Sequence, residues 1–467
     1  MKNSSFEKYV ILYIPWLLAW VLKDNPITSY TIAWLGSFFI FYITFSGKIK
    51  PMPADRSFAE QLMRPIFLAH IIFAGYMSCT SIFYFFNVLG YEDFRKISEY
   101  YLINNEKLQL TAQCQRYYCL AHAAFVSGIL VFMKYPVEKK FYIGKDHLAN
   151  LLMMNAIISF PASILFTYIP GLSQFYYQFS SLSFIAGTLA LAFAIPLQKL
   201  WNTLICLCLY LFNFYLALTS GFKEPIIISV LVLGVFLYPN YKRVVTFTFI
   251  PMLFALFVFL PAYNEVFRQN AWSGDTSSDD ATQLALDAAL SNNSPAHESN
   301  WNFLAFRLSE IDMFTMFASS TPDKIDFYGV KLVEQSLIAI VPRVFWPSKP
   351  STEELIMERV YDAGVIFRAS SVSAKPAFVV DAYLSGGGLG VFICLFIYGA
   401  SSQLIALKAE KLFGGYILGT ALVFSGLFQI FWRGLSFEFI INSVFWSYVT
   451  MLLLSKLLVT LRVLKEV

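Results

Sequence analysis

Residues 389–407 read LGVFICLFIYGASSQLIAL and contain no charged side chain. A run of this length is typical of a transmembrane helix, since crossing the hydrocarbon core takes about 20 apolar residues. Similar runs fill most of the chain: of its 467 residues, 57% are hydrophobic and 14% are charged, and the mean hydropathy is +0.60. A soluble domain usually carries about 25% charged residues. The sequence therefore indicates an all-α polytopic membrane protein.

The apolar runs predict about twelve transmembrane helices, because each run approaches the length that a bilayer requires. Their expected positions are residues 9–22, 27–46, 66–90, 117–133, 148–169, 175–195, 200–218, 225–238, 244–260, 389–407, 413–432 and 440–455. The runs are solidly apolar, which argues against a transmembrane β-barrel, whose strands alternate apolar and polar residues.

One long polar stretch interrupts the runs and predicts a large loop with short amphipathic helices. It divides the chain into helices 1–9 (residues 1–260), the loop (261–388) and helices 10–12 (389–467). One short helix is expected at 281–290. A longer amphipathic helix is expected at 301–319, lying on the membrane or on the bundle, because apolar residues recur there at helical spacing: Trp301, Leu304, Leu308, Ile311 and Phe314.

The distribution of basic residues predicts the orientation of the helices. Alternate short loops are rich in Lys and Arg, which favours a cytoplasmic location for those loops and for both termini. The basic residues in question are Lys48, Lys50, Arg56, Arg64, Lys134, Lys139, Lys140, Lys145, Lys242, Arg243, Lys408, Lys411, Lys456, Arg462 and Lys465. The first apolar run is followed by Lys23 and Asp24 rather than by a cleavage site, so it is expected to be retained. In the inner membrane of a bacterium, the large loop would then face the periplasm.

This topology brings a set of cations to the outer face: Lys223, Arg268, Arg307, Arg343, Lys349, Arg359, Arg368 and Arg433. Arg343 and Lys349 lie in LIAIVPRVFWPSKP, residues 337–350, where three prolines predict a stiff extended turn. Arg and Lys suit a diphosphate such as that of a lipid-linked sugar. Fixed cations can stabilise the charge that develops on such a leaving group without a metal.

Transfer of a sugar also needs a general base for the acceptor hydroxyl. The candidates are Glu310, Asp312, Asp381, Glu438 and His297. The run Gly386–Gly388 lacks the flanking pattern of a phosphate loop and is expected to be a packing hinge. The four histidines show no metal-ligand spacing, and the net charge of +4 does not indicate nucleic-acid binding. We therefore expect no metal, no cofactor and no nucleic acid.

Each of these residues also has a structural interpretation, which the sequence leaves open. Lys223 can snorkel at a helix end, Arg343 can pair locally, and Arg307 can pair with Glu310 one turn along a helix. Surface charges or contacts with lipid headgroups would equally account for Arg268, Arg359 and Arg368.

Three motifs resemble the superfamily of O-antigen polymerases (Wzy-type) and O-antigen ligases. They are Ser220-Gly221-Phe222-Lys223 before an apolar helix, the proline-rich stretch Pro342–Pro350, and the glycine-rich helix entry Asp381–Gly390. Many members carry Arg where this chain has Lys223, which is a departure from the pattern. The resemblance implies a GT-C-like bundle and metal-independent glycosyl transfer at the periplasmic face. Its substrates would be an undecaprenyl-diphosphate-linked glycan donor and acceptor. Whether a protein that regulates chain length binds to it is left open by the sequence.

On this interpretation the chain polymerises oligosaccharide repeat units into O-antigen, capsule or exopolysaccharide. The catalytic residues would be Arg343, Lys223, Asp381 and Glu310, and the substrate-binding residues would be Arg433, Arg307, Lys349, Arg359, Arg368 and Trp346. Three alternatives stay open: a ligase that passes the finished chain to lipid A core, a transporter or flippase of lipid-linked glycans, and a non-catalytic membrane scaffold. The scarcity of charged residues within the spans and the lack of an internal repeat disfavour the transporter.

Overall fold

The computed structural model describes residues 7–56, 61–173, 175–219, 224–271, 277–290, 301–368, 374–415, 419–420 and 435–467. Over these ranges the chain is all-α apart from two short antiparallel pairings, β1 (Tyr91–Glu92) with β2 (Arg95–Lys96) and β3 (Phe141–Tyr142) with β4 (Lys465–Glu466). The predicted site residues Lys223, Arg433 and His297 lie outside the described residues, as do the side chains of Arg268 and Arg307.

Six of the described helical segments are long and apolar enough to cross a bilayer, which indicates a multi-pass membrane protein. They are α3 (Pro26–Phe45), the continuous segment formed by α4 (Pro65–His70), η3 (Ile71–Ser78) and α5 (Cys79–Val88), most of α7 (Lys145–Tyr168), α9 (Leu200–Leu218), α18 (Phe378–Leu412) and α20 (Phe437–Thr460).

The expectation of twelve membrane-crossing helices is therefore wrong. Helices do form at most of the predicted positions, but several are too short or too polar. The first is split into α1 (Glu7–Val10), η1 (Ile11–Tyr13) and α2 (Ile14–Val21), and α10 (Glu224–Leu237) has 14 residues. The expected span 413–432 lies largely outside the described residues.

Other helices combine apolar and polar parts. In α6 (Asn105–Phe132) the first half carries residues such as Gln115 and Arg116, which lower its hydropathy. The remaining apolar helices are α8 (Phe175–Ala194), the π-helical η4 (Val245–Phe249), which follows the short basic helix α11 (Lys242–Val244), and α12 (Ile250–Ala271). Helix α12 runs past the expected end of its span into the polar stretch.

The polar stretch between residues 261 and 388 folds largely as short helices. They are α13 (Ser278–Leu290), the π-helical η5 (Phe303–Leu308), α15 (Ile311–Ser320), α16 (Lys331–Ile340) and α17 (Thr352–Asp362). The helix expected at 281–290 is confirmed as α13, which begins a turn earlier. The amphipathic helix expected at 301–319 is interrupted near Glu310, whose φ is +52°, and its two parts pack on α5 and α6.

Helix α6 is the centre of the bundle and is buried along most of its length. It crosses α18 so closely that a Cβ atom on Gly399 would lie 2.1 Å from the carbonyl oxygen of Phe125. A Cβ on Gly128 would likewise lie 2.2 Å from the oxygen of Phe396. Small residues at helix crossings let two backbones approach, which replaces the hydrophobic driving force that is missing in lipid.

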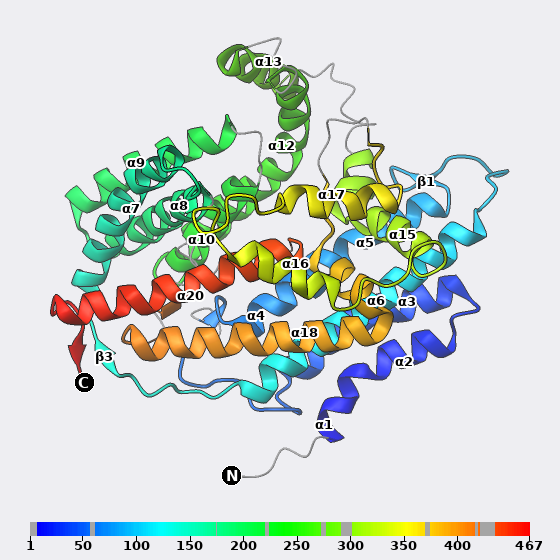
Figure 1. Ribbon diagram of the computed structural model, residues 1–467, viewed down its shortest axis with the longest axis horizontal. Coiled ribbons are helices and arrows are strands. Elements are labelled where there is room, and N and C mark those ends of the chain that lie inside the picture. The colour runs from blue at the N-terminus through cyan, green and yellow to red at the C-terminus, as the bar shows by residue number, and fades with distance from the viewer. Residues whose placement is uncertain are drawn as a thin grey trace.

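One end of the bundle gathers loops that the basic residues assign to the cytoplasm. The backbone N–H of Lys140 donates to the carbonyl of Lys411, and β3 pairs with β4 at the C-terminus. The Lys50 ammonium donates to the carbonyl of Leu130 at 2.6 Å. In Figure 1, α18 and α20 run side by side from the region of α16 and α17 toward this end. The predicted cytoplasmic segments around Lys50, Lys140 and Lys411 and the C-terminal strand therefore lie at one end.

The α6–α18 crossing yields a stability prediction. Gly399→Ala should lower the free energy of unfolding by about 1–3 kcal/mol, because the added methyl group meets backbone rather than a movable side chain. Thermal unfolding in detergent would measure the change. The matched control is Gly187→Ala in α8, where the nearest atom, the Cβ of Ala156, lies at an ordinary 3.6 Å. Equal stability of the two variants would contradict the tight crossing.

Candidate functional site

The end of the molecule formed by α16, α17 and the first turns of α18 and α20 carries a buried ion network centred on Arg359. The guanidinium contacts Glu438 at 2.5 and 3.0 Å and Asp381 at 3.3 and 3.5 Å. It also donates to the side-chain oxygen of Gln335 at 3.0 Å. Arg359 is 1% exposed, and both carboxylates are fully buried. We call this set the Arg359 network.

The Arg359 network joins α16, α17, α18 and α20 through side-chain contacts and one hydrogen bond from the backbone. Asp381 also accepts a 2.8 Å hydrogen bond from the backbone N–H of Phe437, the first residue of α20. Such N–H groups have no partner inside their own helix, so the carboxylate caps α20 and interacts favourably with its dipole. Burial lowers the pKa of Arg359, but Asp381 and Glu438 outweigh it and hold that pKa above its usual value. Arg359 therefore stays charged.

Helix α16 and the following turn lie against α20. Arg359 bridges Gln335 of α16 and Glu438 of α20. Further along, the indole N–H of Trp446 donates to the carbonyl of Ile340 at 2.9 Å. Residues 335 to 340 thus follow α20 from its first turn to its third. The proline stretch 341–350 then reverses the chain, and α17 brings Arg359 back to the start of α20.

The proline stretch is held from within by Lys349. Its ammonium is 6% exposed and donates to the carbonyls of Val341 at 2.7 Å and Ala339 at 3.3 Å. Burial, and then the positive charge of Arg343, lower the pKa of Lys349. Arg343 is half-buried, and its guanidinium donates to the carbonyl of Pro347 at 3.4 Å. The predicted rigid turn is present, and Lys349 stabilises it rather than facing the solvent.

Arg343 lies beside an exposed apolar surface. Its neighbours Val344, Phe345 and Trp346 are 48%, 78% and 39% exposed. Val333 and Leu337 add to this character on the side of α16 that faces away from α20. An exposed apolar surface next to a cation is typical of a segment at the boundary between lipid and water.

The loop between α7 and α8 also contacts this turn. Gly171 has φ +82°, and a Cβ atom there would lie 2.6 Å from the backbone nitrogen of Val344. The ring of Phe175, at the start of α8, packs edge-on against Trp446 at 5.3 Å. The loop between α7 and α8 therefore packs against the backbone next to Arg343.

The structure places the remaining predicted residues apart from one another. Arg368 is 67% exposed, pairs with Asp362 at 3.4 Å and lies over the ring of Tyr361. The Trp346 indole donates to Ser348. Glu310 is exposed and precedes α15 in a left-handed conformation, which is strained for a residue other than glycine. Trp346 lies on the same turn as Arg343, whereas Arg368 and Glu310 have other surroundings.

Among the predicted cations whose side chains the structure describes, Arg343 and Lys349 lie together on the proline-rich turn, whereas Arg359 and Arg368 have other partners. Arg359 is buried and neutralised by carboxylates, so it cannot bind a substrate without breaking that network. For the same reason Asp381 and Glu438 are not positioned to accept a proton from an acceptor hydroxyl. The sequence missed these pairs because partners 22 and 79 residues apart in the chain leave no local pattern.

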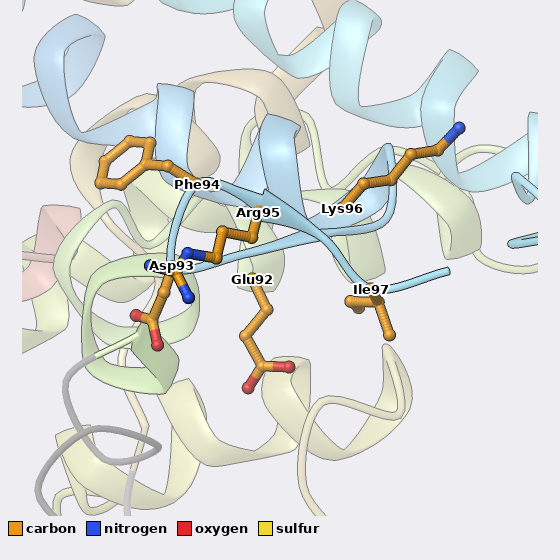
Figure 2. Close-up of a pocket in the computed structure, with 6 residues that line it drawn as sticks. All are labelled: Glu92, Asp93, Phe94, Arg95, Lys96 and Ile97. Atoms are coloured by element: carbon orange, nitrogen blue, oxygen red, sulfur yellow. The ribbon is translucent and has the colours of Figure 1, made fainter. Parts of the chain in front are cut away.

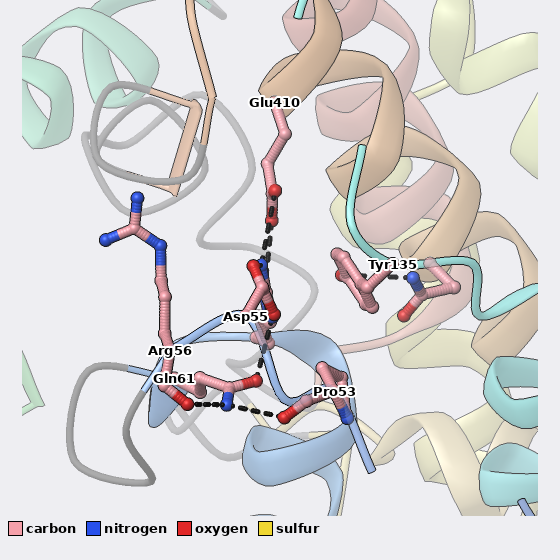
Figure 3. Close-up of polar contacts among 8 residues, drawn as sticks. Pro53, Asp55, Arg56, Gln61, Tyr135 and Glu410 are labelled. Atoms are coloured by element: carbon pink, nitrogen blue, oxygen red, sulfur yellow. Dashed lines mark hydrogen bonds and ion pairs between the residues drawn. The ribbon is translucent and has the colours of Figure 1, made fainter. Parts of the chain in front are cut away.

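A second ion network, which the sequence did not indicate, lies at the opposite end. Arg64 holds Asp55 with two 2.7 Å contacts, Gln61 at 2.8 Å and Glu410 at 3.3 Å, and its guanidinium is 3.8 Å from the Tyr135 ring centre. Figure 3 shows Glu410, Asp55 and Gln61, each of which accepts a hydrogen bond from Arg64. Hydrogen bonds from Arg64 lower the pKa of Asp55. This network fastens the loop before α4 to the end of α18.

Two surface hollows are described, and neither is lined by the predicted cations. One, of about 580 Å³, is lined by six consecutive residues of the β1–β2 hairpin, Glu92–Ile97. Figure 2 shows their side chains spreading in different directions, so they do not converge on a ligand. The other hollow, of about 470 Å³, lies among α5, α6, η5 and α15.

Comparison with known proteins gives a family without an assigned activity. Residues 14–466 match the family described as "Domain of unknown function (DUF8712)", and the chain belongs to that family. No curated protein matches the chain, and no solved structure matches it.

The Arg359 network yields a second prediction. Arg359→Met should lower the free energy of unfolding by about 3–5 kcal/mol, because it leaves two buried carboxylates without their partner. The matched control is Arg368→Met, which removes an exposed ion pair and should change stability by less than about 1 kcal/mol. Unfolding of both variants in the same detergent would measure the difference, and similar losses would show that burial of Arg359 is not decisive.

Proposed function

We propose that this protein is a membrane glycosyltransferase that polymerises undecaprenyl-diphosphate-linked repeat units into a surface polysaccharide at the outer face of the bacterial inner membrane. The proposal combines the resemblance of three motifs to O-antigen polymerases with one structural observation. That observation is the position of Arg343, on a proline-stiffened turn, beside exposed Val344, Phe345 and Trp346.

This arrangement suits a ligand with an apolar tail and an anionic head. The diphosphate of a polyprenyl carrier lies where hydrocarbon meets water, so a protein group that binds it needs to combine apolar surface with positive charge. Arg343 offers a planar fork of donors that matches phosphate oxygens. Lys349 keeps the turn in shape from its buried position and adds positive charge beneath it.

In the proposed reaction, an acceptor sugar hydroxyl forms a new bond to the anomeric carbon of the donor glycan. The bond between that carbon and the diphosphate breaks, and the electron pair leaves with the lipid diphosphate. Arg343, with Lys223 as a second cation, would stabilise the charge that develops there. A carboxylate takes the proton of the hydroxyl. Glu310 is exposed but has surroundings apart from Arg343, so it is not assigned to this step, and Asp381 is assigned a positioning role through Arg359.

The proposal predicts the phenotype of Arg343→Ala. Cells that carry it should make single repeat units and no long chains, because the leaving group loses its cation, while the protein level and membrane insertion stay normal. Gel separation of the surface polysaccharide would measure chain length. Arg95→Ala, in the exposed β2 strand, is the control and should give chains of normal length. Chains of normal length from Arg343→Ala would remove this residue from the mechanism.

The glycan that accumulates separates the polymerase from the ligase. Single repeat units attached to the lipid acceptor indicate loss of polymerisation. Long chains retained on undecaprenyl diphosphate would instead indicate loss of ligation, and they would contradict the proposed reaction while leaving Arg343 in a catalytic role.

A further inference from the structure

A groove of about 470 Å³ lies on the surface of the described part of the chain. It is formed by α5, the start of α6, the π-helical η5 and α15, and its size is within the range of small-molecule sites. Its lining combines apolar, acidic, basic and neutral polar groups: Tyr84, Asn104, Glu106, Lys107, Leu110, Phe306, Asp312, Thr315, Met316 and Ser319.

The groove is a built structure rather than a gap between loops. The Tyr84 hydroxyl lies 3.3 Å from the hydroxyl of Thr315, and its ring packs edge-on against Phe306 at 5.8 Å. Asn104 caps the first turn of α6 by accepting from the N–H of Lys107. The Tyr76 hydroxyl donates to the carbonyl of Leu308 at 2.6 Å, which fastens η5 to the π-helical part of the neighbouring span. Such π-helical segments occur frequently at functional sites.

The charges in the groove argue against an ionic ligand. The ammonium of Lys107 already lies over the rings of Tyr84 and Phe306, at 5.2 and 5.9 Å from their centres. A cationic ligand would have to displace it from the aromatic faces. An anionic ligand would meet the carboxylates of Glu106 and Asp312 as well as Lys107. Neither kind of charged ligand therefore finds a complementary site.

The same lining does complement a polyhydroxylated ring. Carboxylates accept hydrogen bonds from pairs of hydroxyl groups, Asn104 and Lys107 can donate to the sugar oxygens, and the Ser319 hydroxyl, which already donates to the carbonyl of Met316, can accept. The apolar surface of Phe306, Leu110 and Met316 matches the C–H face of a sugar. Phe306 is 36% exposed, so its ring is accessible to a ligand.

We propose that this groove binds an uncharged sugar residue of a glycan. It is connected to the Arg359 network through α18: the Tyr383 hydroxyl donates to the carbonyl of Thr321 at 2.6 Å, directly after α15, and Asp381 lies two residues before Tyr383. The affinity for a sugar follows from the groove itself. The further assignment of the groove as part of the path of the growing chain rests on the proposed function.

Binding of neutral oligosaccharides to the full-length chain in lipid nanodiscs tests the proposal. The probes are fluorescently labelled tetrasaccharides derived from dextran, chitin and galactan, titrated by thermophoresis. At least one should bind saturably. Asp312→Asn and Phe306→Ala should each weaken that binding by about tenfold or more, because each removes a hydrogen-bonding or apolar partner of the ring.

Asp93→Asn is the matched control, since it makes the same substitution in the hairpin hollow and should leave binding unchanged. Asp312→Asn keeps the shape of the side chain, so it remains informative if Phe306→Ala does not fold. The proposal is overturned if no tetrasaccharide binds saturably, or if Asp312→Asn binds as the unaltered chain does. Displacement of the bound sugar by choline or inorganic phosphate would also overturn it, because both would indicate a site for ions.

Arg343→Ala separates this inference from the proposed function. If the variant binds the tetrasaccharide normally and makes no long chains, both proposals stand. If it binds normally and makes chains of normal length, the proposed role of Arg343 fails and the sugar groove stands. If sugar binding depends on Arg343 and not on Asp312, the groove is wrongly placed.

Discussion

The burial of Arg359 between two carboxylates is the constraint on which the end of the molecule formed by α16, α17 and the first turns of α18 and α20 depends. A guanidinium and two carboxylates lose their hydration on burial, so they are stable there only when each meets its partners. Those partners come from α17, α18 and α20, with Gln335 from α16. The position of the short helices relative to the membrane-crossing helices α18 and α20 therefore follows from one charged side chain.

Two further sets of contacts stabilise the rest of the bundle. The glycine crossing of α6 and α18 brings two backbones into contact without polar groups, and Arg64 closes the opposite end by holding Asp55 and Glu410. Hydrogen bonds from Lys349 hold the proline stretch in shape, and Arg343 lies on it beside exposed apolar side chains.

Features that depend on neighbouring residues in the chain could be predicted from the sequence. These are the all-helical class, helix α13, the stiff proline turn and the glycine hinge, which lies within α18 and where Gly387 has φ +61°. The sequence overestimated the membrane-crossing helices because apolar length does not reveal splitting, as in the first expected span, or polar faces, as in α6. It also treated Arg359 as a surface cation, since the carboxylates that surround it lie far away along the chain.

A double-mutant cycle between Arg359 and Glu438 tests the central claim most directly. Unfolding would be measured for Arg359→Met, Glu438→Gln and the double variant. If the two side chains form a buried pair, the double variant should lose less stability than the sum of the single variants, by about 1 kcal/mol or more. Each single variant leaves a buried charge without its partner, whereas the double variant removes both of these charges. Additive losses would contradict the account.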